Sequence, residues 1–173
     1  RVANERSNQL TDVQARVMLS RLEGPPATRA RKFHELSLDR PQVVFFPLHW
    51  VVVHPIDDES PLRGVTPEEF EAADSEILIL LSAMDETFFQ AVHVRSSYKP
   101  QEIAWGMKFA DMFLRTEDGL VGIDMRKIHD LERHGIQVTG RVPLVIPPNE
   151  HNRFYLETKA TKSGHWMDAA GKP

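Results

Sequence analysis

The sequence predicts an all-β sandwich, and three observations lead to this fold class. Residues Thr11 to Leu19 alternate apolar and polar side chains, which is the period-2 pattern of a half-buried strand. Short stretches rich in β-branched and aromatic residues recur between turn signals such as Gly24-Pro25-Pro26. Helix signals occur in only two short segments. Many short strands with little helix are typical of a sandwich.

The first predicted strand has an apolar and a polar face. The apolar face carries Val13, Ala15, Val17 and Leu19, and the polar face carries Asp12, Gln14, Arg16 and Met18. A second strand returns over Arg31 to Leu38. Val43 to His54 predicts two short strands or a bulged edge strand, because Pro47 cannot donate a hydrogen bond to a sheet.

Further strands are predicted along the middle of the chain. Glu76 to Leu81 is a continuous apolar run, which indicates a strand buried on both faces. Another strand begins at Val92. Phe109 to Arg115 and Leu120 to Asp124 flank Glu117-Asp118-Gly119, which is a hairpin signal. Beyond Gly140 we expect a strand or two and then a loose tail.

One or two short helices are expected. Thr66 can cap the first, Pro67 suits its first turn, and Glu69 stands where a capping box needs it, so this helix ends near Asp74. Asp124 can cap the second, with Gly135 ending it.

Composition excludes several classes of function. A net charge of -4 argues against nucleic acid as a partner, because nucleic-acid binding needs a basic surface. The absence of cysteine excludes disulfides and thiolate metal sites. The eight histidines form no His-x-His or HExxH spacing, and there is no GxSxG string or Gly-rich phosphate loop. We therefore expect no catalytic residue, no metal site and no cofactor.

The chain starts at Arg1 and contains no apolar run near the roughly 20 residues that cross a bilayer. We therefore expect a fragment of a longer protein.

Several strings resemble one family. Residues 1–8 (RVANERSN) resemble the RVxNxR segment that follows the inner pore helix of inward rectifiers. Residues 53–57 (VHPID) with 60–62 (SPL) resemble VHxID…SPL, and Pro55 is typical of the bacterial branch. Residues 95–98 (RSSY) with 102–106 (EIAWG) resemble RSSY…EIxWG, and residues 124–129 resemble the motif after the last hairpin. The sequence thus resembles the C-terminal cytoplasmic domain of prokaryotic (KirBac-type) inward rectifier potassium channels.

This resemblance implies an immunoglobulin-like (E-set) β-sandwich that assembles as a homotetramer and extends the ion pathway. Potassium would pass through the ring, and ligands or lipids would gate it. The partner would be the transmembrane pore domain of the same chain, at the cytoplasmic face of the cell (inner) membrane in a multi-pass protein. Residues 1–10 would be the linker after the inner pore helix, 11–140 the sandwich domain, and 141–173 the C-terminal strands and tail.

The resemblance also assigns an acidic pore position. Asp12 matches the vestibule acid that attracts cations, so magnesium or polyamines would bind there. A fourfold axis would turn one aspartate into a ring of four, and acidic rings concentrate cations. Ser82 stands where strongly rectifying members carry a second acid, so we expect weak rectification. The alternative for Asp12 is an ordinary solvated acid.

A gate is implied at the segment from Ala83 to Gln90. Its proposed gate residues are Ala83, Met84, Asp85, Glu86 and Thr87. The alternative is an ordinary strand connection, and we expect Phe88 and Phe89 to be core residues. Glu86 and Lys108 match a pair of opposite charges in the family that positions this loop, and the alternative is two unrelated surface charges.

Arg6 matches a basic position associated with anionic lipid headgroups. Ser7 replaces a second base that animal members often carry, and Glu5 adds a negative charge. The alternative for Arg6 is a tether or interface residue.

Two other functions compete with the channel domain. One is a soluble β-sandwich module that binds a ligand or protein and is unrelated to channels. The other is a β-sandwich hydrolase, which would need a nucleophile such as Ser97 beside a histidine and a carboxylate.

Overall fold

The computed structural model describes residues 1–4, 9–47, 49–115, 121–133 and 144–145. The chain divides into two compact units, Arg1–Ile103 and Ala104–Pro173.

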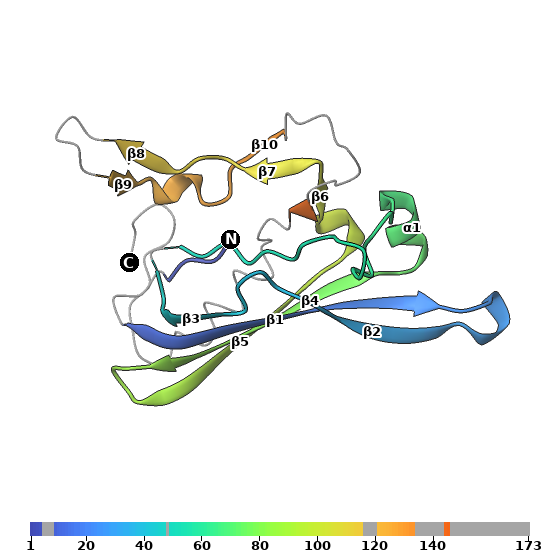
Figure 1. Ribbon diagram of the computed structural model, residues 1–173, viewed down its shortest axis with the longest axis horizontal. Coiled ribbons are helices and arrows are strands. Elements are labelled where there is room, and N and C mark those ends of the chain that lie inside the picture. Colours follow the sequence, from blue (N-terminus) through green and yellow to red (C-terminus); the bar gives the residue numbers. More distant parts are fainter. Residues whose placement is uncertain (5–8, 48, 116–120, 134–143, 146–173) are drawn as a thin grey trace. The chain divides into compact units, whose positions relative to one another are not determined.

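The first unit is built on a five-stranded antiparallel sheet (Figure 1). Its strands are β1 (Leu10–Glu23), β2 (Ala30–Leu36), β3 (Gln42–Phe45), β4 (Glu76–Asp85) and β5 (Gln90–Tyr98). The order is β2-β1-β4-β5, and β3 also pairs with β1. Since β4 runs along one edge of β1, β2 and β3 share the other edge, one at each end of β1.

The alternation predicted for the first strand is confirmed. All four residues of its apolar face are buried: Val13, Ala15, Val17 and Leu19. On the other face Asp12, Gln14 and Arg16 are exposed. Trp50 completes a core cluster with Val13 and Ala15. The strand ends at Glu23, where the predicted break by glycine and proline leads into the turn η1 (Pro26–Thr28).

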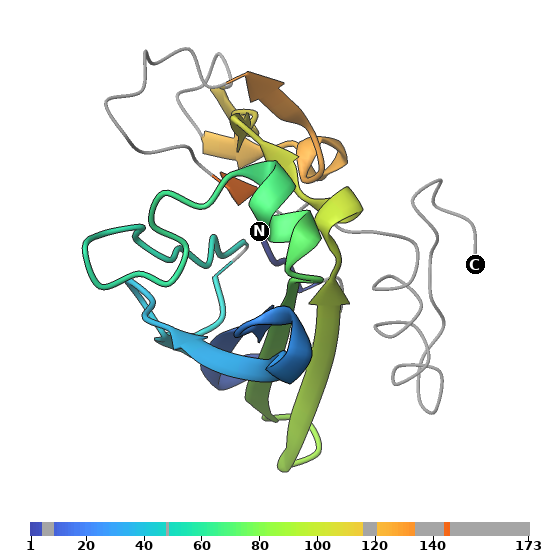
Figure 2. The same ribbon diagram turned by 90° about the vertical axis from the view of Figure 1, so that its right-hand side faces the viewer.

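Helix α1 (Pro67–Ala72) has the predicted capping box. The backbone N–H of Glu69 donates to Thr66 Oγ1 at 3.2 Å, and the backbone N–H of Thr66 donates to Glu69 Oε2 at 3.0 Å. Phe70 anchors the helix, because it is only 1% exposed. Figure 2 shows α1 beside η2 (Pro100–Glu102), where Gln101 donates to Glu71.

The second unit contains three two-stranded antiparallel sheets in its described part. These pair β7 (Met107–Phe109) with β10 (Leu131–Arg133), β6 (Ala104–Trp105) with β11 (Leu144–Val145), and β8 (Phe113–Arg115) with β9 (Val121–Ile123). The pairing of β8 with β9 confirms the predicted hairpin. Asp124 caps η3 (Met125–Lys127) by accepting from the backbone N–H of Arg126.

The structure corrects three expectations. The second helix is one 3-10 turn, and Leu131–Arg133 is a strand instead of the helix expected to reach Gly135. Between Val43 and His54 the described part has one strand, β3, followed by an isolated bridge from Trp50 to Val2. Strand β4 is not buried on both faces: Ile77 is buried, but the following apolar residues are half-buried because one face of the sheet is open.

The all-β class is confirmed, since antiparallel strands dominate the described residues and helices are short. The immunoglobulin-like detail and the boundaries at residues 10 and 140 stay predictions.

Replacing Leu19 by alanine tests which face of β1 is the core. Leu19 is 0% exposed, so Leu19→Ala should lower the free energy of unfolding by about 2–5 kcal/mol. The neighbouring Met18→Ala should cost less than half of that, because Met18 lies on the other face and is half-buried. Urea denaturation measures both, and equal losses would contradict the assigned faces.

A cluster of charged side chains lies at the C-terminal end of β1. Glu23 accepts a hydrogen bond from Arg21 Nε at 2.7 Å, and His34 Nε2 lies 2.7 Å from the same carboxylate oxygen. Lys32 adds a longer ion pair at 3.6 Å. The hydrogen bonds from Arg21 and His34 lower the pKa of Glu23 to about 2.

This cluster predicts a loss of stability in acid. The pKa of Glu23 in the folded chain is about 2, below the ordinary 4.5, so its stabilisation is complete above pH 4.5 and is lost as the pH falls toward 2. Glu23→Gln should therefore lose stability less steeply than the wild type between these pH values. Denaturation at several pH values measures the slope. Glu59→Gln, at an exposed loop residue, is the control and should keep the wild-type slope.

Candidate functional site

The candidate site lies on the outer face of the sheet, defined here as the face that carries Asp12, Gln14 and Arg16. Residues directly opposite one another in an antiparallel sheet share a face. The register adds four residues to the outer face: Leu80, Ser82, His93 and Arg95. The outer face is polar and carries both acidic and basic groups.

Asp12 occupies a bulge in β1. Thr11 is opposite Met84 and Gln14 is opposite Ser82, so Asp12 and Val13 together oppose one residue of β4. Asp12 has a φ of 49°, in the left-handed region. Aspartate is among the few side chains that tolerate this conformation. Bulges turn side chains away from the regular direction of a strand, so this one fixes where the exposed carboxylate of Asp12 points.

Ser82 is bonded to a histidine on the next strand. Its Oγ lies 2.9 Å from Nδ1 of His93, which is directly opposite on β5. Where the resemblance implies the loss of a second acid, the outer face therefore carries a neutral hydroxyl hydrogen-bonded to an imidazole ring.

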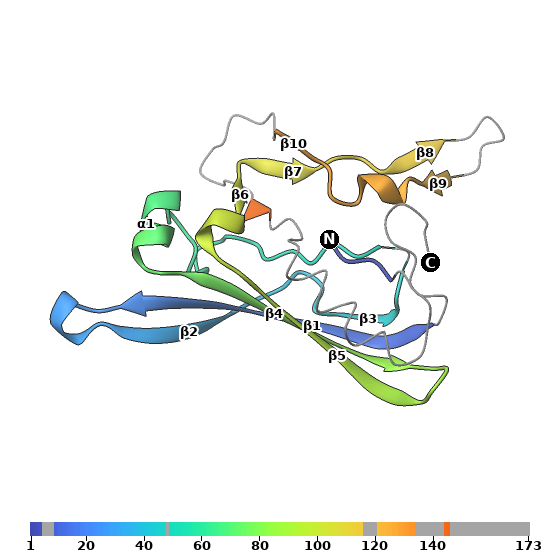
Figure 3. The ribbon, with the colours of Figure 1, turned by 180° about the vertical axis from the view of Figure 1, so that it is seen from behind.

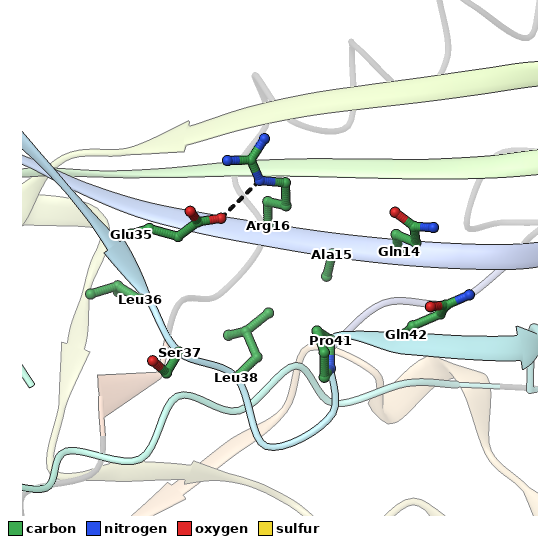
Figure 4. Close-up of a pocket in the computed structure, with 9 residues that line it drawn as sticks. All are labelled: Gln14, Ala15, Arg16, Glu35, Leu36, Ser37, Leu38, Pro41 and Gln42. Carbon is green, nitrogen blue, oxygen red and sulfur yellow. Dashed lines mark hydrogen bonds and ion pairs between the residues drawn. The ribbon is translucent and has the colours of Figure 1, made fainter.

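Arg16 and Glu35 form an ion pair at the mouth of a cavity of about 530 Å³ (Figure 4). The cavity lies beside β1, between Val17, where the pairing with β2 ends, and Gln14, where the pairing with β3 begins. Arg16 Nε donates to Glu35 Oε1 at 2.8 Å, and this hydrogen bond lowers the pKa of Glu35 and raises that of Arg16. The two charges compensate each other, so this part of the face has little net charge.

The predicted gate residues begin inside β4. Ala83, Met84 and Asp85 belong to the strand, and the turn to β5 covers residues 86–89. Ala83 packs against the core cluster, whereas Met84 is 39% exposed. Thr87 is exposed on the turn.

A buried carboxylate shapes this turn. Asp85 is 1% exposed, and its Oδ1 accepts from the backbone N–H groups of Thr87 at 2.9 Å and Phe88 at 3.4 Å. The backbone N–H of Glu86 donates to the carbonyl of Gln9 at 3.3 Å, which ties the turn to the chain entering β1. The expectation that Phe88 and Phe89 are core residues is wrong: the turn holds them 56% and 86% exposed.

Two predicted site residues remain, Lys108 and Arg6. Lys108 forms an ion pair at 2.8 Å with Glu132, its neighbour across β7 and β10. Its pairing with Glu86 stays a prediction. Arg6 lies outside the described residues.

The VHPID and SPL strings form one hydrogen-bonded turn. His54 Nδ1 lies 2.6 Å from the carbonyl oxygen of Ser37, and Nε2 lies 2.7 Å from Ser60 Oγ. A carbonyl only accepts, so Nδ1 donates to Ser37. Ser60 Oγ accepts from the N–H of Leu62 at 3.1 Å and donates to Nε2. These residues therefore have a structural role.

In the RSSY and EIAWG strings, Tyr98 and Glu102 have structural roles. Tyr98 is 8% exposed, and burial raises its pKa. Glu102 Oε2 accepts from the backbone N–H of Lys99 at 2.8 Å, which closes the η2 turn.

The hydrolase alternative finds no support around Ser97. It lies opposite Leu78, and His93 is four residues away on the same strand, about 13 Å at 3.3 Å per residue. Among the described residues, no cluster of three or more His, Asp or Glu could hold a metal ion. No helix in the described part is long and apolar enough to span a membrane.

Comparison with known proteins decides the family. Residues 1–140 match the family described as inward rectifier potassium channel C-terminal domain. The chain belongs to this family. It is 38% identical over 132 residues to inward rectifier potassium channel Kirbac3.1 of Paramagnetospirillum magnetotacticum, covering 76% of this chain and 45% of that protein.

Animal inward rectifiers are more distant. Human inward rectifier potassium channel 4 is 29% identical over 140 residues, which cover 75% of this chain and 30% of that protein. Human ATP-sensitive inward rectifier potassium channel 15 is 28% identical over 102 residues, 59% of this chain and 27% of that protein. This inward rectifier domain spans less than half the length of these relatives. Potassium channels are not enzymes, so this kinship confirms the prediction of no enzymatic activity.

Sequence reasoning missed two partners on the outer face of this inward rectifier domain. Glu35 and His93 both lie on strands that were expected, and Glu35 is exposed between half-buried His34 and buried Leu36. Their contacts with Arg16 and Ser82 depend on which residues stand opposite each other across strands. That register is not readable from one strand alone.

The left-handed backbone of Asp12 in the bulge leads to a prediction about stability. Asp12→Asn should leave the free energy of unfolding within about 0.5 kcal/mol, because asparagine also tolerates a left-handed backbone. Asp12→Val should lower it by about 1–2 kcal/mol, since β-branched residues are disfavoured there. Gln14→Val, on the same face two residues away, is the control. Urea denaturation would contradict the bulge if Asp12→Val were as stable as Gln14→Val.

Proposed function

We propose that this chain is the cytoplasmic pore and regulatory domain of a tetrameric inward rectifier potassium channel. The observation that carries the proposal is the exposed carboxylate of Asp12, directed by a bulge on the outer face of the sheet. Family membership supports a channel over an unrelated binding module. In the proposed tetramer the outer face lines the extension of the ion pathway.

Fourfold symmetry gives Asp12 its effect. Two unit charges about 4 Å apart interact by only about 1 kcal/mol in bulk water. Four carboxylates around one axis, in a passage with low-dielectric walls, act on the same cation together, and such rings raise the local concentration of cations. Potassium would pass this ring, and magnesium or polyamines would bind at it.

The rest of the outer face favours weak block. Ser82 is a neutral hydroxyl bonded to His93. Glu35 is compensated by Arg16, and Arg95 adds a positive charge. Beside the neutral pair of Ser82 and His93, Asp12 is therefore the acid proposed to hold blocking cations.

The β4–β5 turn is the proposed gate. Asp85 holds the turn through two backbone N–H groups, and Met84 stands exposed one residue before it. A ring of four apolar side chains can close a pore by excluding water. Glu86 and Lys108 are proposed to position this segment, within or between subunits.

The same proposal places the domain at the cytoplasmic face of the cell membrane, joined to a transmembrane pore domain of the same protein. Gating would respond to ligands or anionic lipids. Arg6 is the proposed lipid contact, since one basic side chain near anionic headgroups gains about 1 kcal/mol.

Block by internal cations tests the role of Asp12. In the full-length channel reconstituted in bilayers, Asp12→Asn should raise the magnesium or spermine concentration for half block by about tenfold, which corresponds to about 1.4 kcal/mol. Asparagine keeps the left-handed backbone, so the change removes charge with little change of shape. Current–voltage curves with internal blocker measure the effect.

The matched control is Asp58→Asn. Asp58 is an exposed aspartate in a loop, paired with Arg63 at 2.8 Å. This variant should block like the wild type. Unchanged block in Asp12→Asn, or an equal shift in Asp58→Asn, would remove Asp12 from the ion pathway.

A further inference from the structure

The cavity beside β1 has the size and the lining of a small-molecule site. Its volume is about 530 Å³, and ligand sites in proteins span roughly 300–1,000 Å³. Four apolar residues line it: Ala15, Leu36, Leu38 and Pro41. Ala15 and Leu36 are buried and Leu38 packs against the core cluster, so the core of the first unit fixes this lining. All the lining residues belong to that unit.

The chain between β2 and β3 is held away from β1. Figures 1 and 3 show β2 and β3 beside different ends of β1, and Figure 4 shows the curved segment between them. The carbonyl of Ser37 accepts from His54 Nδ1 at 2.6 Å. The backbone N–H of Asp39 donates to the carbonyl of Val53 at 3.0 Å. These bonds form the cavity before any ligand arrives, and a preorganised site loses less entropy on binding.

Arg16 and Glu35 each present unpaired atoms at the mouth of the cavity. Their hydrogen bond uses only Arg16 Nε and Glu35 Oε1, as Figure 4 shows. Among the described residues, nothing is hydrogen-bonded to Arg16 Nη1 or Nη2, or to Glu35 Oε2. Their side chains are 60% and 55% exposed. A bound molecule can therefore reach a guanidinium edge and a carboxylate oxygen without breaking the ion pair.

These two groups select a ligand that carries both charges close together. The terminal edge of a guanidinium forms two parallel hydrogen bonds with a carboxylate. The neighbouring carboxylate oxygen accepts from an ammonium group. Because one 2.8 Å bond joins the two side chains, Glu35 would repel a simple anion and Arg16 would repel a simple cation. An α-amino acid satisfies both, since one carbon carries its ammonium and carboxylate groups.

Two glutamines add polar groups to the same mouth. Gln14 and Gln42 are opposite each other on β1 and β3, so they share the outer face. Both are exposed, and neither side-chain amide is hydrogen-bonded to another described residue. Figure 4 shows them at the end of the cavity away from Glu35 and Leu36. Side-chain amides both donate and accept, so the mouth is polar above an apolar lining.

We propose that this cavity binds a small α-amino acid with an apolar side chain. The carboxylate of the ligand accepts from Arg16 Nη1 and Nη2, and its ammonium donates to Glu35 Oε2. Its side chain lies against Leu36 and Leu38. The inference supplies a ligand class for the regulation included in the proposed function, and in that respect it rests on the proposed function. Binding itself needs only the first unit.

Isothermal titration calorimetry of the 173-residue chain with L-leucine tests the inference. The wild type should bind one molecule per chain. Arg16→Gln and Glu35→Gln should each raise the dissociation constant at least tenfold, and both should fold, because an exposed ion pair adds little stability. Arg63→Gln is the matched control. Arg63 has a 61% exposed side chain, pairs with Asp58 at 2.8 Å and does not line the cavity, so this variant should bind like the wild type.

Three related molecules test the charges and the side chain of the ligand separately. Isocaproate keeps the carboxylate without the ammonium, isoamylamine keeps the ammonium without the carboxylate, and glycine keeps both charges without an apolar side chain. Each should bind at least tenfold more weakly than L-leucine. Glu35→Gln should bring the affinities for L-leucine and isocaproate together, because it removes the partner of the ammonium. A merely structural role of Glu35 would weaken both ligands equally.

A third variant closes the mouth without changing any charge. Gln42 is exposed on β3, so Gln42→Trp keeps a strand-forming residue there and should unfold at the same urea concentration as the wild type. The indole ring would cover the mouth beside Gln14. The affinity for L-leucine should therefore fall at least tenfold.

The outcomes separate this inference from the proposed function. Absence of saturable L-leucine binding, wild-type affinity in Arg16→Gln, Glu35→Gln or Gln42→Trp, or an equal loss in Arg63→Gln would each overturn it. Equal binding of isocaproate and L-leucine would also overturn it and identify an anion site. Cation block that depends on Asp12 in the full-length channel would uphold the proposed function in any of these cases. L-Leucine binding without that block would uphold the cavity as a binding site and contradict the proposed role of Asp12.

Discussion

Strand β1 is hydrogen-bonded to β2 and β3 along one edge and to β4 along the other. A slip of one residue in this strand would move every side chain to the opposite face. Leu19 and its apolar neighbours would then face water, and Asp12 would face the core. Burial of the apolar row therefore fixes the register, and the register fixes the position of the carboxylate. The candidate site is thus a consequence of core packing on the reverse side of the same strand.

The bulge is the one place where this regularity is interrupted. It lies at the start of β1, close to the turn that Asp85 organises, and Phe89 in that turn is also left-handed. Two left-handed residues thus occur at this end of the sheet, one tolerated by its aspartate side chain and one costly for a bulky phenylalanine. At the other end of β1, Glu23, Arg21 and His34 form an ordinary hydrogen-bonded ion cluster. Asp74, which pairs with Arg31 at that same end, is left-handed as well, so left-handed residues occur at both ends of the strand.

Local patterns in the sequence predict the features that local physics decides. The alternation of β1, the capping box at Thr66 and the β8–β9 hairpin each depend on a few neighbouring residues, and all three are confirmed. Phe89 was expected in the core, but it is 86% exposed. Its hydrophobicity alone does not reveal that a turn holds the side chain in solvent. The Arg16–Glu35 pair is formed across strands 19 residues apart, so it depends on tertiary pairing. The position of Asp12 was read from resemblance, whereas its bulge needed the register with β4.

In the proposed ring, four Asp12 carboxylates repel one another. Bringing them toward one axis costs about 1 kcal/mol for each pair about 4 Å apart in water, and more where the passage excludes water. The opposite face of β1 buries Val13, Ala15, Val17 and Leu19, so each subunit's own core holds this strand in place. The carboxylate of Asp12 takes no part in that core. It can therefore stay exposed and charged on a strand whose stability does not depend on it.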